Sequence, residues 1–242
     1  IPAGNGNYQD LIRLLDEFVE FRDPGGDRPD QIIRDRAGQP IDPVTDYGKS
    51  AIDAKHAQIN RFQARIRDMN VVAWSRDQQV DYLAVRSRLN QAAFTLHLSR
   101  PWARDPGFYV DRMLRVTFTD LPVEGEELEK FLASLRAIPV LVSEARKHLD
   151  DVAADYADLA IHNLSHSDGV GHGYPDRAVP PAGVLGWYGD LLERADAQPE
   201  LVDEIRTARN AVREFDQWLK AQRERWTAPA GVGKVAFDWY LK

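Results

Sequence analysis

Apolar and polar residues alternate along most of this chain with the period of an α-helix. Apolar positions recur three and four residues apart, a spacing that places them on one face of a helix. Near the carboxyl end, six such residues form a continuous stripe: Leu201, Ile205, Ala208, Val212, Phe215 and Leu219. The spacing predicts helices over residues 8–22, 45–69, 75–98, 108–118, 124–136, 139–164, 184–195 and 199–226. No segment has a convincing strand pattern, so the sequence predicts an all-α fold, a multi-helix array of long amphipathic helices.

Residues that cap or interrupt helices indicate where these helices begin and end. Ser75 and Gln78 have the spacing of a capping box, in which each side chain bonds the backbone of the other residue. Pro101 and Pro106 end the preceding helix, because proline lacks the N–H group that a helix interior requires. Pro139 is tolerated best at the first position of a helix. We therefore expect one helix to end near residue 136 and another to open at Pro139.

Two long segments rich in glycine and proline separate the predicted helices. The first covers residues 24–46 and the second residues 165–183. Irregular segments of this length are uncommon in compact proteins and are often functional. The alternative for the first segment is a surface connection between distant helices. The chain length allows one large or two small domains, and we expect a single helical domain over residues 1–242.

Composition narrows the classes of function. The chain has 242 residues, with 31 lysines and arginines against 38 aspartates and glutamates, which gives a formal charge of −7. Hydrophobic residues make up 43% and charged residues 29%, an ordinary globular mixture. The acidic balance argues against a nucleic-acid partner. No apolar run approaches the roughly 20 residues that span a bilayer, so no membrane span is expected. The absence of cysteine excludes disulfides, thiolate catalysis and cysteine-bound metal.

One candidate site is a polar stripe on the helix predicted from Pro139. Six residues recur there at intervals of three and four: His148, Asp151, Asp155, Asp158, His162 and His166. Asp158, His162 and His166 could offer one carboxylate and two imidazole nitrogens to a metal ion. If the helix borders a cleft, the stripe, including Asp155, would suit a cationic group of a substrate. The alternative is an ordinary solvated helix face with Asp–His pairs one turn apart, in which case no metal is bound.

A second candidate site is an aromatic and guanidinium cluster close to two prolines. It contains Trp102, Arg104, Phe108 and Tyr109. These side chains could line a substrate channel, with Arg104 gripping a carboxylate group. Alternatively, Trp102 and Tyr109 seal a junction between helices while Arg104 pairs with a nearby aspartate.

Several common catalytic motifs are absent from the sequence. None of the six histidines is followed by glutamate, which excludes a His-Glu-x-x-His zinc-peptidase motif. No Gly-x-Ser-x-Gly nucleophile elbow is present. The glycine-rich segments 169–173 and 231–234 do not match a phosphate-binding loop, because Lys234 is followed by Val235 and not by serine or threonine. These segments are interpreted as tight turns and the start of a helix.

Four segments, taken in order, resemble a known bacterial family. They read QVDYL at 79–83, RPWARDPGFY at 100–109, GVLGWY at 183–188 and GVGKVAFDWYL at 231–241. Together they are similar to the amino-terminal half of the domain-of-unknown-function 885 family, and the match extends from about Tyr8 to Lys242. Members of that family are longer, largely helical and often exported. Their carboxyl-terminal half carries a His-Glu-x-x-Pro-Gly-His segment and a later glutamate, which looks like a zinc-peptidase site.

The resemblance implies that this chain is the amino-terminal helical portion of a zinc-peptidase-like hydrolase. It would form one wall of a substrate channel and be inactive without the missing catalytic half, which would hold the zinc; no cofactor is expected in this chain. The partner would be the carboxyl-terminal portion of the same precursor or a separate chain that carries it, with a peptide as substrate. Residues expected to face the channel are Trp102, Arg104, Tyr109, Asp155 and Asp158, and no catalytic residue can be assigned.

Two further expectations concern the whole protein. The chain starts at Ile1 without an initiator methionine, which fits either a removed export signal or an engineered start. We therefore expect an exported protein, periplasmic or secreted. A free-standing helical binding or scaffolding protein without catalytic activity is the alternative function.

Overall fold

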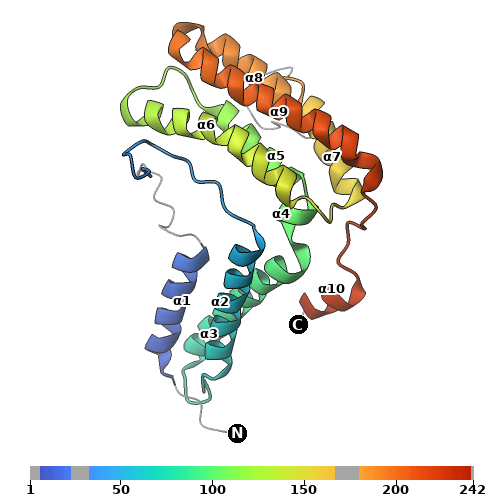
Figure 1. Ribbon diagram of the computed structural model, residues 1–242. Coiled ribbons are helices and arrows are strands. Elements are labelled where there is room, and N and C mark those ends of the chain that lie inside the picture. Colours follow the sequence, from blue (N-terminus) through green and yellow to red (C-terminus); the bar gives the residue numbers. More distant parts are fainter. Residues whose placement is uncertain (1–5, 23–32, 167–179, 241–242) are drawn as a thin grey trace. The chain divides into compact units, whose positions relative to one another are not determined.

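The computed structural model describes residues 6–22, 33–166 and 180–240, and helices dominate all three ranges (Figure 1). Within these ranges there is no β-strand, and β-type pairing is limited to two isolated bridges, Arg34 with Pro40 and Ala153 with Ala228. The predicted all-α fold is therefore confirmed. Most of the second predicted loop, including the glycine-rich segment 169–173, lies outside the described residues.

Contacts between residues divide the chain into two compact units. The first unit comprises residues 1–31, 48–100 and 232–242, and the second comprises residues 32–47 and 101–231. Each unit has its own buried apolar residues. The expectation of one domain over the whole chain stays a prediction.

The first unit is built from three helices that pack side by side (Figure 1). They are α1 (Tyr8–Arg22), α2 (Lys49–Arg67) and α3 (Arg76–Phe94), and a short π-helical segment, η1 (Thr95–Ser99), extends α3. Their apolar stripes meet in one core: Leu11, Leu14, Phe18, Ile59, Phe62, Ile66, Val85, Leu89 and Ala93. The predicted capping box at the start of α3 is confirmed, because Ser75 Oγ accepts from the backbone N–H of Gln78 while Gln78 Oε1 accepts from that of Ser75.

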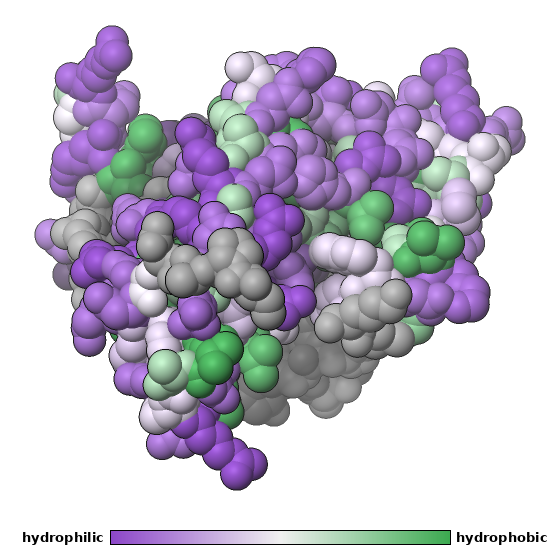
Figure 2. All heavy atoms as spheres, turned by 90° about the horizontal axis from the view of Figure 1, so that it is seen from below, coloured by the Kyte–Doolittle hydropathy of each residue, from purple (hydrophilic) through white to green (hydrophobic). Residues whose placement is uncertain are grey.

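A short helix near the carboxyl end, α10 (Lys234–Tyr240), packs on α3 within the first unit. The ring of Trp239 stacks on that of Phe94 with centroids 6.1 Å apart, and Tyr240 contacts the same ring at 4.7 Å. Other apolar side chains of α3 and α10 stay exposed, including Leu83 and Phe237. In a space-filling view, apolar residues form separate small patches within a mostly hydrophilic face (Figure 2).

The second unit is organised around the long helix α6 (Gly125–His148), which lies beside α9 (Val202–Gln222) in Figure 1. The predicted stripe is confirmed, since Leu201, just before α9, and the other five residues, on α9, are all fully buried. The other helices of this unit are α4 (Pro101–Arg104), α5 (Gly107–Arg115), η2 (Val116–Phe118), α7 (Ala154–Ser165), α8 (Gly183–Arg194), η3 (Ala195–Ala197), η4 (Pro199–Leu201) and η5 (Arg223–Arg225).

The expectation that Pro139 opens a new helix is wrong. Pro139 lies inside α6, which continues to His148. The cost of a proline in a helix interior is about 3 kcal/mol. Buried residues on both sides of it, such as Leu135 and Leu141, keep the helix packed inward, and each such side chain contributes roughly 1.5–3 kcal/mol. Packing therefore outweighs the local preference of proline.

The helix breaks instead between Leu149 and Ala153, where the chain turns from α6 into α7. Backbone N–H groups there find partners outside both helices. Asp151 N–H donates to Ala103 C=O at 3.2 Å and Ala153 N–H donates to Arg104 C=O at 3.0 Å. The predicted six-residue polar stripe is therefore divided between two helices and the turn that joins them.

The start of α8 requires a glycine. Gly183 has φ +66°, and a Cβ atom at this position would lie 2.5 Å from the backbone nitrogen of Ser165 and 2.7 Å from that of His166. Gly125, the first residue of α6, has a similar φ of +55° but open space around the Cβ position. The two glycines thus share one backbone constraint and differ in packing.

We predict that Gly183→Ala destabilises the protein more than Gly125→Ala. Gly125→Ala should cost only the left-handed backbone strain, about 1–2 kcal/mol, whereas Gly183→Ala adds a clash with the end of α7. Chemical denaturation of the two variants and the wild type measures the difference. Equal losses of stability would show that the close approach of α8 to α7 is not rigid.

Candidate functional site

The second unit contains an open groove with a volume of about 1090 Å³. One wall is the irregular segment 33–47, which we call the strap. The other walls come from α5, from the loop after it and from α6. The described part of the first predicted loop therefore forms part of a cavity in addition to connecting helices.

Arginine side chains hold the strap against the helices. Arg112 on α5 donates through Nη2 to Asp42 Oδ1 and to the carbonyl of Pro43, the latter at 3.0 Å. Arg34 of the strap donates to Glu129 Oε2 on α6 at 2.6 Å. These contacts join the strap to both α5 and α6.

The groove combines an apolar base with charged rims. Val116, Val123 and Phe131 line it and are buried. Both signs of charge are present among its other lining residues, which include Asp111, Arg115, Asp120 and Glu127. Such a surface can hold a ligand that carries apolar groups together with charged or polar ones.

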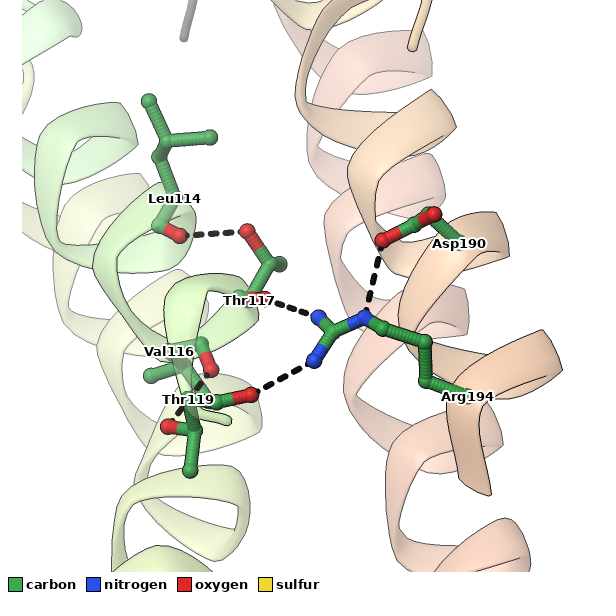
Figure 3. A network of polar contacts seen from close by, with 6 residues as sticks. All are labelled: Leu114, Val116, Thr117, Thr119, Asp190 and Arg194. Carbon is green, nitrogen blue, oxygen red and sulfur yellow. Dashed lines mark hydrogen bonds and ion pairs between the residues drawn. The ribbon is translucent and has the colours of Figure 1, made fainter. Parts of the chain in front are cut away.

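Arg194 on α8 holds the loop that forms one rim of the groove (Figure 3). Its guanidinium donates to the carbonyls of Thr119 and Thr117, each at 2.6 Å, and to Asp190 Oδ2 at 3.0 Å. Thr119 lines the groove. Arg194 thus positions the rim without lining the groove itself.

Gln198 fixes the same loop further along the chain. Its amide oxygen accepts from the backbone N–H of Val123 and its amide nitrogen donates to the carbonyl of Val123, both at 2.9 Å. Gln198 is 8% exposed, so this two-way pairing is shielded from water. Side chains from the α8–α9 region therefore determine the shape of a groove that lies over α5 and α6.

Aromatic rings gather where the strap reaches α4 and α5. The ring of Tyr47 stacks on Trp102 with centroids 5.2 Å apart, and Phe108 meets it edge-on at 5.6 Å. Tyr47 and Phe108 also line the groove. Burial raises the pKa of the Tyr47 hydroxyl above its ordinary value, so this side chain is neutral at physiological pH.

Asp46, Glu144 and His148 lie together beside this aromatic group. Each offers one ligand atom, and the three atoms lie within 4.8 Å of one another. Glu144 Oε2 is 3.1 Å from His148 Nε2, and Lys147 Nζ donates to Glu144 Oε1 at 2.6 Å. The lysine contact and, secondarily, His148 lower the pKa of Glu144, which therefore carries a full negative charge. These three side chains could hold a metal ion.

The sequence contained only part of the signal for this cluster. His148 belonged to the predicted polar stripe, and Glu144 precedes it by one helical turn. Asp46 comes from the strap, and nothing in its local sequence indicates that it meets the end of α6.

Trp102, Arg104 and Tyr109, predicted to line a channel, are buried. The Tyr109 hydroxyl donates to the carbonyl of Trp102 at 2.7 Å, and Arg104 Nη2 donates to the carbonyl of Pro229 at 2.5 Å. Arg104 Nε also lies 3.5 Å from Asp151 Oδ2. These contacts match the alternative of a sealed helix junction with an Arg–Asp pair, while a role in a channel stays a prediction.

Asp155 and Asp158 are exposed on α7 and do not line the groove. Asp158 is held by Arg223, whose Nη2 donates to Asp158 Oδ2 at 2.6 Å while its Nε bonds the other carboxylate oxygen. His162 and His166 stack on each other with centroids 4.2 Å apart. Among the described residues, the three-ligand grouping is Asp46, Glu144 and His148, so the structure does not bring Asp158, His162 and His166 together as metal ligands.

Comparisons with known proteins show the fold alone. No family model and no curated protein matches the chain. Among solved structures, it is similar to a protein from Shewanella oneidensis described as "a putative lipoprotein of unknown function", with a TM-score of 0.59 and 16% sequence identity. The likeness covers 91% of this chain and 38% of that one, so the chain spans less than two fifths of its solved neighbour. None of the described helices is long and apolar enough to cross a membrane.

We predict that Arg194→Met destabilises the protein by about 2–4 kcal/mol, because two carbonyls lose a charged donor and the buried Asp190 loses one ion-pair partner. Arg206→Met is the matched control, since Arg206 pairs with Asp203 on an exposed surface and should contribute less than about 1 kcal/mol. Urea denaturation of both variants measures the difference. Similar, small losses would contradict the role assigned to Arg194.

A second prediction concerns pH. The Arg223 guanidinium lowers the pKa of Asp158 from its ordinary value of 3.8, so the pair stabilises the folded state above that value and the contribution disappears as pH falls through the lower folded-state pKa. Asp158→Asn should reduce stability modestly near neutral pH, by less than about 1 kcal/mol because the pair is exposed. The difference from wild type should narrow as the pH falls below 3.8. Thermal melts across this range test it, with Asp155→Asn as the control that leaves the Arg223 pair intact.

Proposed function

We propose that this chain is the amino-terminal helical portion of a longer, exported zinc-peptidase-like protein. In this proposal the groove of the second unit binds an extended segment of a peptide substrate and forms one wall of the substrate channel. The catalytic zinc belongs to a carboxyl-terminal portion of the same precursor, or to a separate chain, as the resemblance of the four sequence segments implies.

The groove is the observation that carries the proposal. Its volume of about 1090 Å³ is slightly above the range for small-molecule sites, roughly 300–1,000 Å³. An extended peptide directs successive side chains to opposite sides. The buried apolar base suits one set of these side chains, and the charged rims suit polar side chains and the peptide backbone.

Two findings support a longer, exported protein. The solved neighbour contains the same fold within a chain of which this one covers 38%. The description of that neighbour names it a lipoprotein, and lipoproteins are exported proteins. Because this chain has no His-Glu-x-x-His motif, the proposal assigns the catalytic site to another portion.

A free-standing peptide-binding protein is the second candidate. One observation favours it, namely that every residue lining the groove comes from the second unit itself. Such a groove needs no further portion to be complete. Both candidates predict peptide binding, and they differ in whether a catalytic portion joins this chain.

The test uses fluorescein-labelled peptides of mixed apolar and charged composition, with binding followed by fluorescence anisotropy. We predict that the wild-type chain binds them and that Ser134→Trp, which fills the groove, weakens binding at least about tenfold, or 1.4 kcal/mol. Asn210→Trp, on the exposed face of α9, is the control and should bind as the wild type does. The same mixtures, supplied with zinc and analysed by mass spectrometry, should contain only intact peptide.

Each contrary result addresses a different part of the proposal. Failure of the wild-type chain to bind any peptide would remove the groove as a substrate site. Peptide hydrolysis by this chain alone would contradict a catalytic site located elsewhere. Equal binding by Ser134→Trp and Asn210→Trp would place the peptide on another surface.

A further inference from the structure

We propose that Asp46, Glu144 and His148 form a binding site for a divalent transition-metal ion such as Zn²⁺. This site lies within the present chain, so it is separate from the catalytic zinc of the proposed longer protein. It does not depend on whether the groove binds peptides. The site lies at the end of α6, which is close to Asp46 and Tyr47 at the end of the strap.

The spacing of the three donors is close to that of a metal site. Ligands bound to zinc at roughly 2.0–2.2 Å in a tetrahedral arrangement lie about 3.4 Å from each other. All three donor atoms lie within 4.8 Å of one another, and Glu144 Oε2 is 3.1 Å from His148 Nε2. Small side-chain movements would therefore place one ion in contact with all three, and water would complete its coordination.

The chemistry of the donors favours a transition metal. Mg²⁺ and Ca²⁺ prefer sites made only of oxygen ligands, whereas an imidazole nitrogen suits zinc and its neighbours. His148 would bind through the lone pair of Nε2 in the neutral form that keeps its proton on Nδ1. Lys147 contacts Oε1 of Glu144, so Oε2 is the oxygen that faces His148 and the ion.

Three features of the surroundings favour a cation, whereas the Lys147 ammonium beside Glu144 Oε1 opposes it. His148 is the last residue of α6 and Glu144 lies one turn before it, near the helix end where the dipole is negative. Their side chains are only 20% and 15% exposed, so the charge of the ion would be less screened than on an open surface. The ring of Tyr47 packs edge-on against His148 at 6.3 Å and limits the orientations of the imidazole. A bound ion would join the strap, through Asp46, to the end of α6.

The proposal is tested by isothermal titration of the metal-free chain with zinc chloride. The wild type should bind zinc, and Asp46→Asn, Glu144→Gln and His148→Ala should each weaken the affinity at least about tenfold. The matched control is the double variant His162→Ala/His166→Ala, which removes the stacked histidine pair of α7 and should keep wild-type affinity at the Asp46 cluster. Far-UV circular dichroism of each metal-free variant verifies that it is folded.

Asp46→Asn is the most informative variant, because Asp46 is exposed and the change removes a charge without changing side-chain size. The proposal is overturned if the wild type does not bind zinc, or if all three substitutions leave its affinity unchanged. It is also overturned if the affinity is lost in the double histidine variant and kept in Asp46→Asn. Titration with Co²⁺, followed by visible absorption, gives a second measurement. The absorption of Co²⁺ bound to the wild type should be lost in folded His148→Ala.

Discussion

The packing of α6 against α9 is the interaction on which the second unit depends. Within this unit α6 is continuous through Pro139, because the buried side chains on both sides of the proline outweigh its cost of about 3 kcal/mol. The continuous helix then carries residues of both candidate sites. Phe131 and Ser134 line the groove, and Glu144 and His148 belong to the metal-ligand cluster at the end of the same helix.

Polar side chains that bond backbone groups shape the groove around this helix. Arg112 holds the strap, and Arg194 and Gln198 hold the loop of the opposite rim. Each bonds at least one carbonyl that lies outside regular secondary structure or at its end, where the helix ladder supplies no partner. Such contacts restrain irregular segments, and a groove whose walls are already ordered binds an extended chain at a lower entropic cost.

Local features of the sequence were predictable, and long-range ones were not. The Ser75–Gln78 capping box and the buried stripe of α9 depend on residues within one or a few turns, and both are confirmed. Pro139 was misjudged because its local preference competes with packing against a helix that follows much later in the sequence. The Asp46 cluster was missed for the same reason, since Asp46 is far from Glu144 and His148 along the chain. The polar stripe was predicted on a single helix because the helix boundary was placed at Pro139, whereas the structure has the break after His148.

Hydrogen–deuterium exchange of the full chain, with and without a saturating peptide, maps where an extended ligand lies on this protein. Peptide binding in the groove should slow amide exchange in the strap and in the part of the chain from Phe108 to Ser134, with little change in α1 and α2. Protection confined to the first unit, or none in the strap, would contradict it.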